Sequence, residues 1–170
     1  MVARAILVFV LLLGASAAAR EGSGGWTTYV NERFGFSLRY PADVFISDRQ
    51  SAAGDGEVFS VVQGEGRLLV GALENNNGYT VAEYMDLLRR QSYARFTVTY
   101  ARRSASWFVV SGDDGRDVFY EKVMFSCGGR LINSFSLLYP TASKLRFDPI
   151  VEHIENTFRA GQCDRRHAAG

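Results

Sequence analysis

Between Trp107 and Tyr139 the chain has three consecutive stretches that are apolar at most positions and are separated by turn residues. Alternate residues of a β-strand point to opposite faces of the sheet. In the middle stretch one face carries Val118, Tyr120 and Met124, and the other face carries Phe119, Val123 and Phe125. The turns Asp113–Gly115 and Gly128–Gly129 supply residues that tolerate positive φ in tight hairpins. The pattern predicts an antiparallel meander of three strands that is covered on both faces.

Shorter strand patterns precede this meander. Apolar and polar residues alternate over 34–40 and 96–100, and the runs 58–63 and 67–73 are separated by glycines, which is typical of a hairpin. In contrast, Ser47–Gly56 is polar, rich in small residues and without periodicity. This segment is predicted to be a surface loop.

Two further stretches have the periodicity of amphipathic helices. Thr80 and Glu83 fit a capping box at the start of the first, which extends to about Tyr93. Asp148–Pro149 fits the N-cap and first position of the second, and Gly161 fits its C-terminal stop. Together with the meander, these helices predict an α+β fold in which helices cover an antiparallel β-sheet, as an α/β/α sandwich.

The first residues have the three parts of a secretory signal peptide, namely Arg4, the apolar run Ala5–Leu13 and the small-residue site Ala17–Ala19. The expected organisation is a signal peptide at 1–19, a flexible leader at 20–25, a single α+β domain at 26–160 and a C-terminal tail at 161–170. The apolar run is short for a bilayer span and no second one follows it. We therefore expect an exported protein, periplasmic or extracellular, without a transmembrane anchor in its mature form.

The charge balance argues against a polyanionic partner. The chain has 19 basic and 18 acidic residues, and removal of Arg4 with the leader leaves 18 of each. A nucleic-acid binder usually has a net basic domain, whereas here the arginines at 89–90, 95 and 102–103 form only a local group. No nucleic-acid partner is expected.

The two cysteines, Cys127 and Cys163, predict a disulfide in an exported chain. A catalytic alternative remains, because Cys127 needs only spatial proximity to His153 to form a nucleophile pair. An unrecognised pair of carboxylates would be another catalytic arrangement.

Other charged residues also have structural explanations. Asp113, Asp114 and Asp117 surround a glycine, but their spacing does not fit a calcium-binding loop and does fit a hairpin turn. Glu121 and Lys122 lie within the doubly apolar stretch, one on each face, where a buried charge would indicate function and a position near the edge of a covering layer would not. The histidines are not at metal-ligand spacing, so no metal or cofactor is expected.

The segment Asn75–Gly78 is predicted to be a turn at the rim of the sheet. Asn75, Asn76 and Asn77 offer amide donors and acceptors without a charge. They are the candidate contacts for a protein partner or a small polar ligand, at a rim that they share with the Ser47–Gly56 loop. Turn geometry explains the same residues equally well.

Three segments resemble small exported bacterial domains related to PsbP, the extrinsic subunit of photosystem II: Tyr29–Pro41, Phe119–Lys122 and Phe147–Phe158. The resemblance covers about Trp26 to Arg159. It implies an antiparallel sheet between helical layers, and members that act as assembly factors, extrinsic subunits or ligand binders and are not established enzymes. It transfers no functional residue.

The first functional hypothesis is therefore a non-catalytic exported binding or accessory module for a protein partner or small ligand. An enzyme that uses Cys127 or a carboxylate pair is one alternative, and a structural component of the cell envelope is another.

The leader pattern generates the first testable prediction. Cleavage after Ala19 should release a mature chain that begins at Arg20, because a signal peptidase recognises small residues before the scissile bond. The intact mass of the exported protein measures this directly. Recovery of the chain in the membrane with Met1–Ala19 still attached would contradict the assignment of an exported soluble module.

Overall fold

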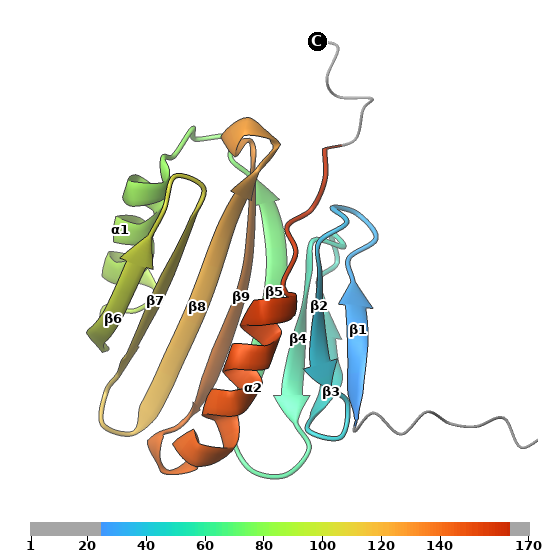
Figure 1. The fold of residues 1–170 in the computed structure, drawn as a ribbon, viewed down its shortest axis with the longest axis vertical. Helices are drawn as coiled ribbons and strands as arrows, with labels where there is room; N and C mark the ends of the chain where they lie inside the picture. The colour runs from blue at the N-terminus through green and yellow to red at the C-terminus, as the bar shows by residue number, and fades with distance from the viewer. Residues whose placement is uncertain (1–24, 164–170) are drawn as a thin grey trace, which may run out of the picture.

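The computed structural model describes residues 25–163, which form a seven-stranded antiparallel sheet, a separate two-stranded sheet and two α-helices (Figure 1). In spatial order the strands of the large sheet are β3 (Phe45–Gln50), β4 (Gly56–Val61), β5 (Arg67–Glu74), β9 (Leu131–Pro140), β8 (Asp117–Ser126), β7 (Trp107–Asp113) and β6 (Thr97–Arg103). The remaining elements are β1 (Trp26–Val30), β2 (Ser37–Pro41), α1 (Val81–Gln91), α2 (Lys144–Thr157) and the 3₁₀ turns η1 (Cys127–Gly129) and η2 (Thr141–Ser143). The predicted signal peptide lies outside the described residues, as do most of the flexible leader and most of the tail.

The predicted meander is confirmed as β7, β8 and β9, and the general α+β class is confirmed with it. Strands β8 and β9 pair along their whole length, from Asp117 opposite Pro140 to Ser126 opposite Leu131. Consecutive residues of β8 enter different cores, because Val118 belongs to the core under α2 and Phe119 to the core under α1. Both faces of the central strands are therefore buried, as the apolar pattern predicted.

The two covering layers are offset from one another across the sheet. Helix α1 lies behind β6 and β7 in Figure 1, whereas α2 crosses in front of β9 and packs against β2. The β1–β2 hairpin extends the α2 layer toward β3 and β4. In the part of the chain that the structure describes, the α2 layer buries side chains of β3, β4, β5, β9 and the start of β8, whereas the α1 layer buries side chains of β7, β8 and β9.

Helix α1 begins as the capping box predicted. The Thr80 hydroxyl accepts a hydrogen bond from the Glu83 amide at 3.3 Å, and the Glu83 carboxylate accepts one from the Thr80 amide at 2.8 Å. Because this carboxylate binds the helix N-terminus, the pKa of Glu83 lies below its usual value. The apolar stripe of α1 packs on Phe108, Phe119 and neighbouring side chains of the sheet.

The predicted start of the second helix at Asp148–Pro149 is wrong. Helix α2 begins at Lys144, and Pro149 lies inside it. The helix begins early because Phe147 is completely buried and stacks on Tyr139 at 5.0 Å between ring centroids. Pro149 cannot donate to the carbonyl of Leu145, but Leu145 is 97% exposed, so water can satisfy that acceptor.

The predicted Ser47–Gly56 loop is wrong over its first part, because β3 continues to Gln50 and only the turn 51–55 is irregular. Strand β3 is at the edge of the sheet, and five of its six residues are exposed, so it lacks the apolar alternation of a half-buried strand. A bulge between Ser47 and Arg49 also interrupts its pairing with β4.

The segment after α2 returns along β2 and closes the fold. Ser37 and Arg159 exchange backbone hydrogen bonds of 3.0 and 2.8 Å. Gly161 was predicted to stop the helix, but α2 ends at Thr157 and Gly161 is required for a different reason: a Cβ at this position would collide with the carbonyl oxygen of Phe34. The Gly161 amide donates to the side chain of Asn133 at 3.0 Å. The chain then reaches Cys163, which forms the predicted disulfide with Cys127.

Neither α1 nor α2, the helices of the part that the structure describes, combines the length and the apolar content that a membrane span requires.

The disulfide should be a major contribution to stability. It closes a loop with a sequence separation of 36 residues. Replacing both cysteines by serine should therefore lower the unfolding free energy by about 4 kcal/mol, mainly because the unfolded chain regains conformational entropy. Urea denaturation followed by circular dichroism measures the change, and the reduced wild-type protein should give the same curve. A loss of less than about 1 kcal/mol would contradict this estimate.

Candidate functional site

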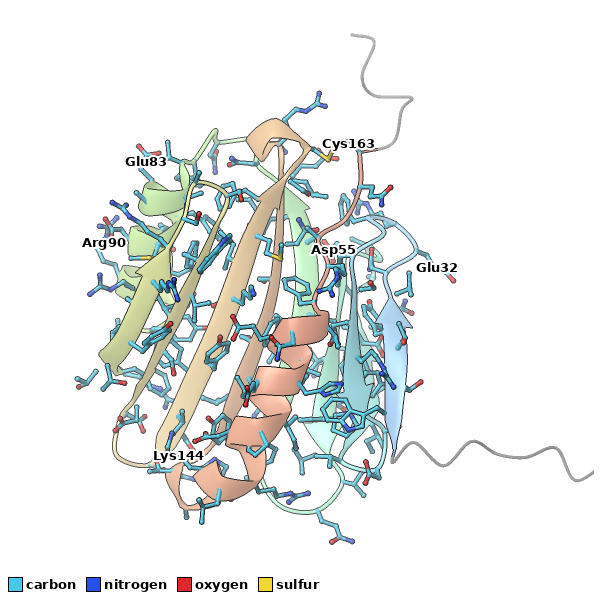
Figure 2. All side chains as sticks on the ribbon, viewed as in Figure 1. Glu32, Asp55, Glu83, Arg90, Lys144 and Cys163 are labelled. Atoms are coloured by element: carbon cyan, nitrogen blue, oxygen red, sulfur yellow. A yellow bond between two sulfur atoms is a disulfide. The ribbon has the colours of Figure 1, made fainter. Side chains whose placement is uncertain are left out.

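Several connections from distant parts of the sequence meet at one end of the sheet. We call this end the rim and define it by the segments 31–35, 51–55, 75–78 and 127–130. Hydrogen bonds hold neighbouring segments together, from the Ala72 amide to the Asp55 carbonyl and from the Asn75 amide to the Arg130 carbonyl, each at 2.8 Å. Glu32, Asp55 and Cys163 mark this end in Figure 2.

The three consecutive asparagines of the 75–78 turn have different roles. The Asn75 side chain donates to the carbonyls of Tyr79 and Gly129 at 2.9 and 2.8 Å and accepts from the Tyr79 amide at 2.9 Å. It therefore fastens the start of α1 to the β8–β9 turn. Asn76 and Asn77 are exposed, and Asn77 makes only a long contact of 3.5 Å to the Tyr79 hydroxyl. Their amides remain accessible to a partner.

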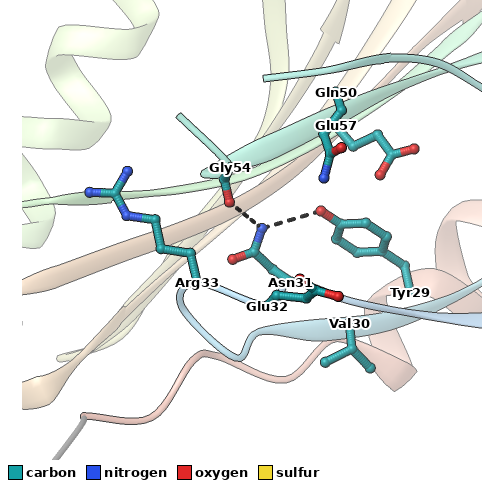
Figure 3. A pocket seen from close by; sticks show the side chains of 8 residues that line it. All are labelled: Tyr29, Val30, Asn31, Glu32, Arg33, Gln50, Gly54 and Glu57. Carbon is teal, nitrogen blue, oxygen red and sulfur yellow. Dashed lines mark hydrogen bonds between the residues drawn. The ribbon is translucent and has the colours of Figure 1, made fainter. Parts of the chain in front are cut away.

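A pocket of about 460 Å³ lies between the β1–β2 hairpin and the β3–β4 turn (Figure 3). It is lined by Tyr29, Val30, Asn31, Glu32, Arg33, Gln50, Gly54 and Glu57. Two of these residues, Gln50 and Gly54, belong to the Ser47–Gly56 segment that the sequence singled out. The others come from the first hairpin and from β4, which the sequence did not connect with it.

Asn31 gives the pocket a rigid wall. It is 3% exposed, and its side-chain amide donates to the Gly54 carbonyl at 2.9 Å and to the Tyr29 hydroxyl at 3.3 Å. Its side-chain oxygen accepts from the Phe34 amide at 2.8 Å. Asn31 therefore joins the two hairpins across the pocket with few polar atoms left free (Figure 3).

The pocket presents mainly hydrogen-bond acceptors. Glu32 and Glu57 contribute carboxylates, and the Tyr29 ring points toward Gln50 and Glu57 (Figure 3). Burial raises the pKa of Tyr29 above its usual value, and the negative charge of Glu57 adds to this effect, although the hydrogen bond from Asn31 acts in the opposite direction. The phenol is therefore neutral at physiological pH. Arg33 extends away from the pocket and donates to the Ala53 carbonyl at 2.9 Å. The local field is therefore suited to a cationic or hydrogen-bond-donating group.

The structure does not support the proposed cysteine nucleophile. Cys127 is bonded to Cys163, so it has no thiol to ionise. The ring of His153 lies 3.8 Å from that of Trp26, between ring centroids, on the α2 side of the sheet. Over residues 25–163, no group of side chains is arranged to hold a metal ion.

Glu121 is a buried acid whose importance the sequence did not establish. It is 7% exposed beneath α1, and the Tyr93 hydroxyl donates to its carboxyl group. The Tyr93 ring stacks on Phe119 at 3.8 Å between centroids, which fixes the hydroxyl over the acid. Loss of hydration raises the pKa of Glu121 to about 7, although the hydrogen bond from Tyr93 acts in the opposite direction. The signal in the sequence was a charged residue within a doubly apolar strand.

Lys122 and Glu155 form a separate polar cluster on the opposite face. Their charged atoms lie 3.1 Å apart, and the Tyr120 hydroxyl also donates to Glu155. The adjacent charged residues of β8, Glu121 and Lys122, therefore have separate polar partners, Tyr93 on the α1 side and Glu155 on the α2 side.

Comparisons with known proteins identify the fold. No protein-family model and no curated protein sequence matches the chain. The solution structure of cyanobacterial PsbP (CyanoP) from Synechocystis sp. PCC 6803 is similar, with a TM-score of 0.60 and 14% identity over 87% of this chain and 98% of that one. The Ran-binding protein Mog1p of Saccharomyces cerevisiae is similar with a TM-score of 0.58 and 10% identity, over 81% of this chain and 96% of that one. The fold is PsbP-like, as the sequence resemblance implied; identities this low show the fold alone.

Glu121 should make stability depend on pH. Its pKa is about 7 in the folded protein and 4.5 in its ordinary state, so the unfolded chain binds fewer protons between these values. The unfolding free energy should therefore fall by about 3 kcal/mol as pH rises through this window and stay constant above it. Glu121→Gln should remove this decrease.

Urea denaturation between about pH 4 and pH 8.5 tests this expectation. Glu65→Gln is a suitable control, because the Glu65 side chain is 73% exposed in the β4–β5 turn. Identical pH dependence in Glu121→Gln and wild type would show that Glu121 does not cause the effect.

Proposed function

We propose that this chain is a non-catalytic, exported binding module that recognises a protein partner at its rim, with the pocket between the first two hairpins receiving a basic side chain. The observation that carries this proposal is the pocket itself, because two carboxylates and a phenol line it while its one arginine is directed outward. A Lys or Arg side chain inserted there would meet Glu57, Glu32 and the Tyr29 hydroxyl.

The shared fold supports a protein partner. Mog1p, which has this fold over almost its whole length, is a Ran-binding protein. The resemblance to PsbP-related domains also implies a role as an extrinsic subunit or an assembly factor. Asn76 and Asn77 are exposed in the 75–78 segment of the same rim and would add neutral hydrogen bonds around the charged contact.

The loops of the rim are also held in place, as is favourable for a recognition site. Its loops are fixed to a rigid sheet by Asn31 and Asn75, each of which makes three side-chain hydrogen bonds. Ordered loops lose little conformational entropy on binding, so more of the contact energy is expressed as affinity. The pocket volume of about 460 Å³ is also within the range of small-ligand sites, so a free amine is the second candidate ligand.

Export is supported by the leader pattern and by the disulfide between Cys127 and Cys163, which is typical of an oxidising compartment. The proposed location is the periplasm or the extracellular space.

An NMR titration with N-acetyl-arginine amide tests the pocket chemistry. N-acetyl-citrulline amide has almost the same shape without the charge, so it is the matched control ligand. We expect arginine-dependent shifts in the backbone amides of Tyr29, Gln50 and Glu57, with a dissociation constant of about 1 to 10 mM for so small a probe. Glu57→Gln should weaken binding by about fivefold, whereas the exposed Glu65→Gln should not change it.

The outcome is decisive for the pocket. Equal shifts with arginine and citrulline, or shifts located away from the rim, would contradict the proposed recognition of a basic side chain. The protein-binding function is measured separately, by the affinity of a purified partner for the Asn76→Ser/Asn77→Ser variant and for Glu57→Gln. Unchanged affinity in both variants would place the binding surface elsewhere.

A further inference from the structure

Strand β6 is an edge strand, because in the described part of the chain it pairs only with β7 (Figure 1). The Ser104 amide donates to the Trp107 carbonyl at 2.8 Å, which identifies these two residues as a hydrogen-bonded pair. Bonded and non-bonded pairs alternate along an antiparallel ladder. Arg102 therefore bonds to β7, whereas the backbone amide and carbonyl groups of Ala101 and Arg103 point away from the sheet. This edge can accept a further strand.

A groove lies between this edge and helix α1, which packs on β6 and β7. It contains a pocket of about 340 Å³ that is lined by Asp86, Arg89, Arg90, Tyr93, Ala94, Phe96 and Val98. The first three of these residues lie on one stripe of α1 and form a wall. Tyr93, Phe96 and Val98 are half-buried against the core under α1 and form an apolar floor.

The register of β6 shows which side chains of an added strand would enter the groove. Ala101 and Arg103 place their side chains on the α1 side, because they pair with Val110 and Phe108, which belong to the core under α1. A residue opposite Ala101 in an added strand has its side chain on this same side. Its neighbours in that strand have theirs on the α2 side, where one of them meets Arg102.

The free part of the edge is basic. Strand β6 ends with Arg102 and Arg103, which are both exposed, and it contains no acidic residue. On the wall of the groove, Asp86 lies 4.0 Å from Arg89, so Arg90 gives this wall one net positive charge (Figure 2). The edge and the wall together therefore attract carboxylates.

The acidic residues near β6 lie at its other end. Asp113 is opposite Thr97, the first residue of the strand. Asp114 and Asp117 follow in the β7–β8 turn, where Arg95 lies 3.6 and 3.7 Å from their carboxylates. The positive potential of the edge is thus concentrated toward Arg103.

We propose that β6 and the groove bind an extended acidic segment of another protein, which adds to the sheet as an antiparallel strand. A residue of this segment exchanges two backbone hydrogen bonds with Ala101. Carboxylates before it face Arg102 and Arg103, and an aliphatic side chain after it enters the pocket over Phe96 and Val98. The antiparallel direction is favoured, because parallel pairs are slightly less stable per residue.

Charge selects this occupant over a second copy of the chain. Pairing of β6 with another β6 would bring Arg102 and Arg103 of both copies into one ladder that has no acidic residue. The proposed site is also separate from the rim pocket, which adjoins β3 and β4 near the opposite edge of the sheet. The two sites can therefore be tested independently.

An NMR titration of the mature protein with the heptapeptide acetyl-Ser-Glu-Glu-Val-Thr-Leu-Thr-amide tests the proposal. The peptide places its valine opposite Ala101 and its two glutamates opposite Arg102 and Arg103. We expect shifts of the Ala101 and Arg103 backbone amides, with a Kd of about 0.1 to 1 mM. A control peptide with glutamine in place of both glutamates should bind about fivefold more weakly.

A second control peptide tests the backbone hydrogen bonds. N-methylation of the valine removes its N–H group and keeps its side chain and the charge of the peptide. This peptide should bind at least about tenfold more weakly, because the Ala101 carbonyl loses its donor and the methyl group keeps the strands apart.

A charge exchange tests the contacts of the glutamates. The variant Arg102→Glu/Arg103→Glu should bind the acidic peptide at least about tenfold more weakly, and should bind the peptide with two lysines within about threefold of the wild-type affinity for the acidic one. Arg49→Glu makes the same kind of change on β3, the other edge strand, and should leave binding of the acidic peptide unchanged. Circular dichroism verifies that each variant is folded.

Several results would contradict the proposal. Absence of shifts at about 5 mM acidic peptide would mean that the arginines only protect the edge from pairing. Equal binding of the N-methylated peptide would show attraction by charge without an added strand. Shifts of the Ala101 and Arg103 amides that depend on protein concentration alone would assign the edge to a second copy.

Discussion

The pairing of β8 with β9 is the constraint on which the rest of the structure depends. Ten consecutive residues of β8 pair with ten of β9, and apolar side chains leave this ribbon on both faces. Each face of the ribbon must therefore be shielded from water by its own layer, and the two layers come from different parts of the chain. Helix α1 precedes the meander and α2 follows it, so the layers meet the ribbon from opposite faces and are displaced toward opposite edges. The uncovered areas beside them are a direct result of this displacement.

Buried polar side chains hold the connections between these layers. Asn133 is completely buried, and its amide donates to the Met124 carbonyl and the Ser126 hydroxyl while its oxygen accepts from the Gly161 amide. It thereby fastens the C-terminal segment to the central ribbon. Asn31 and Asn75 perform comparable roles at the rim. These amides stabilise connections whose geometry apolar packing alone would not specify, since dispersion forces are not directional.

The sequence was sufficient for elements whose signals are local. Alternation in β7, β8 and β9, the capping box of Thr80 and Glu83, and an even number of cysteines each reflect interactions close to the backbone or a single covalent bond. It was not sufficient for β3, whose exposure as an edge strand removes the apolar alternation, or for the start of α2, which depends on Phe147 reaching Tyr139. The pocket could not be predicted, because Asn31 and Gly54 are distant in sequence and meet only in the fold. The same reason concealed the role of Asn75: its turn position was evident, but its contact with Gly129 was not.

The mutual contact of the first hairpin and the last helix also affects how the chain can acquire its structure. Strand β2 contacts mainly β1, α2 and Arg159. The central strand β5 has β4 as one neighbour and lacks its second neighbour until β9 has paired with it. Neither can be completed while the C-terminal third of the chain is still being synthesised. Such long-range closure slows folding and delays the native state until the chain is released. The order of the strands thus commits the polypeptide to a compact form only when its last residues arrive.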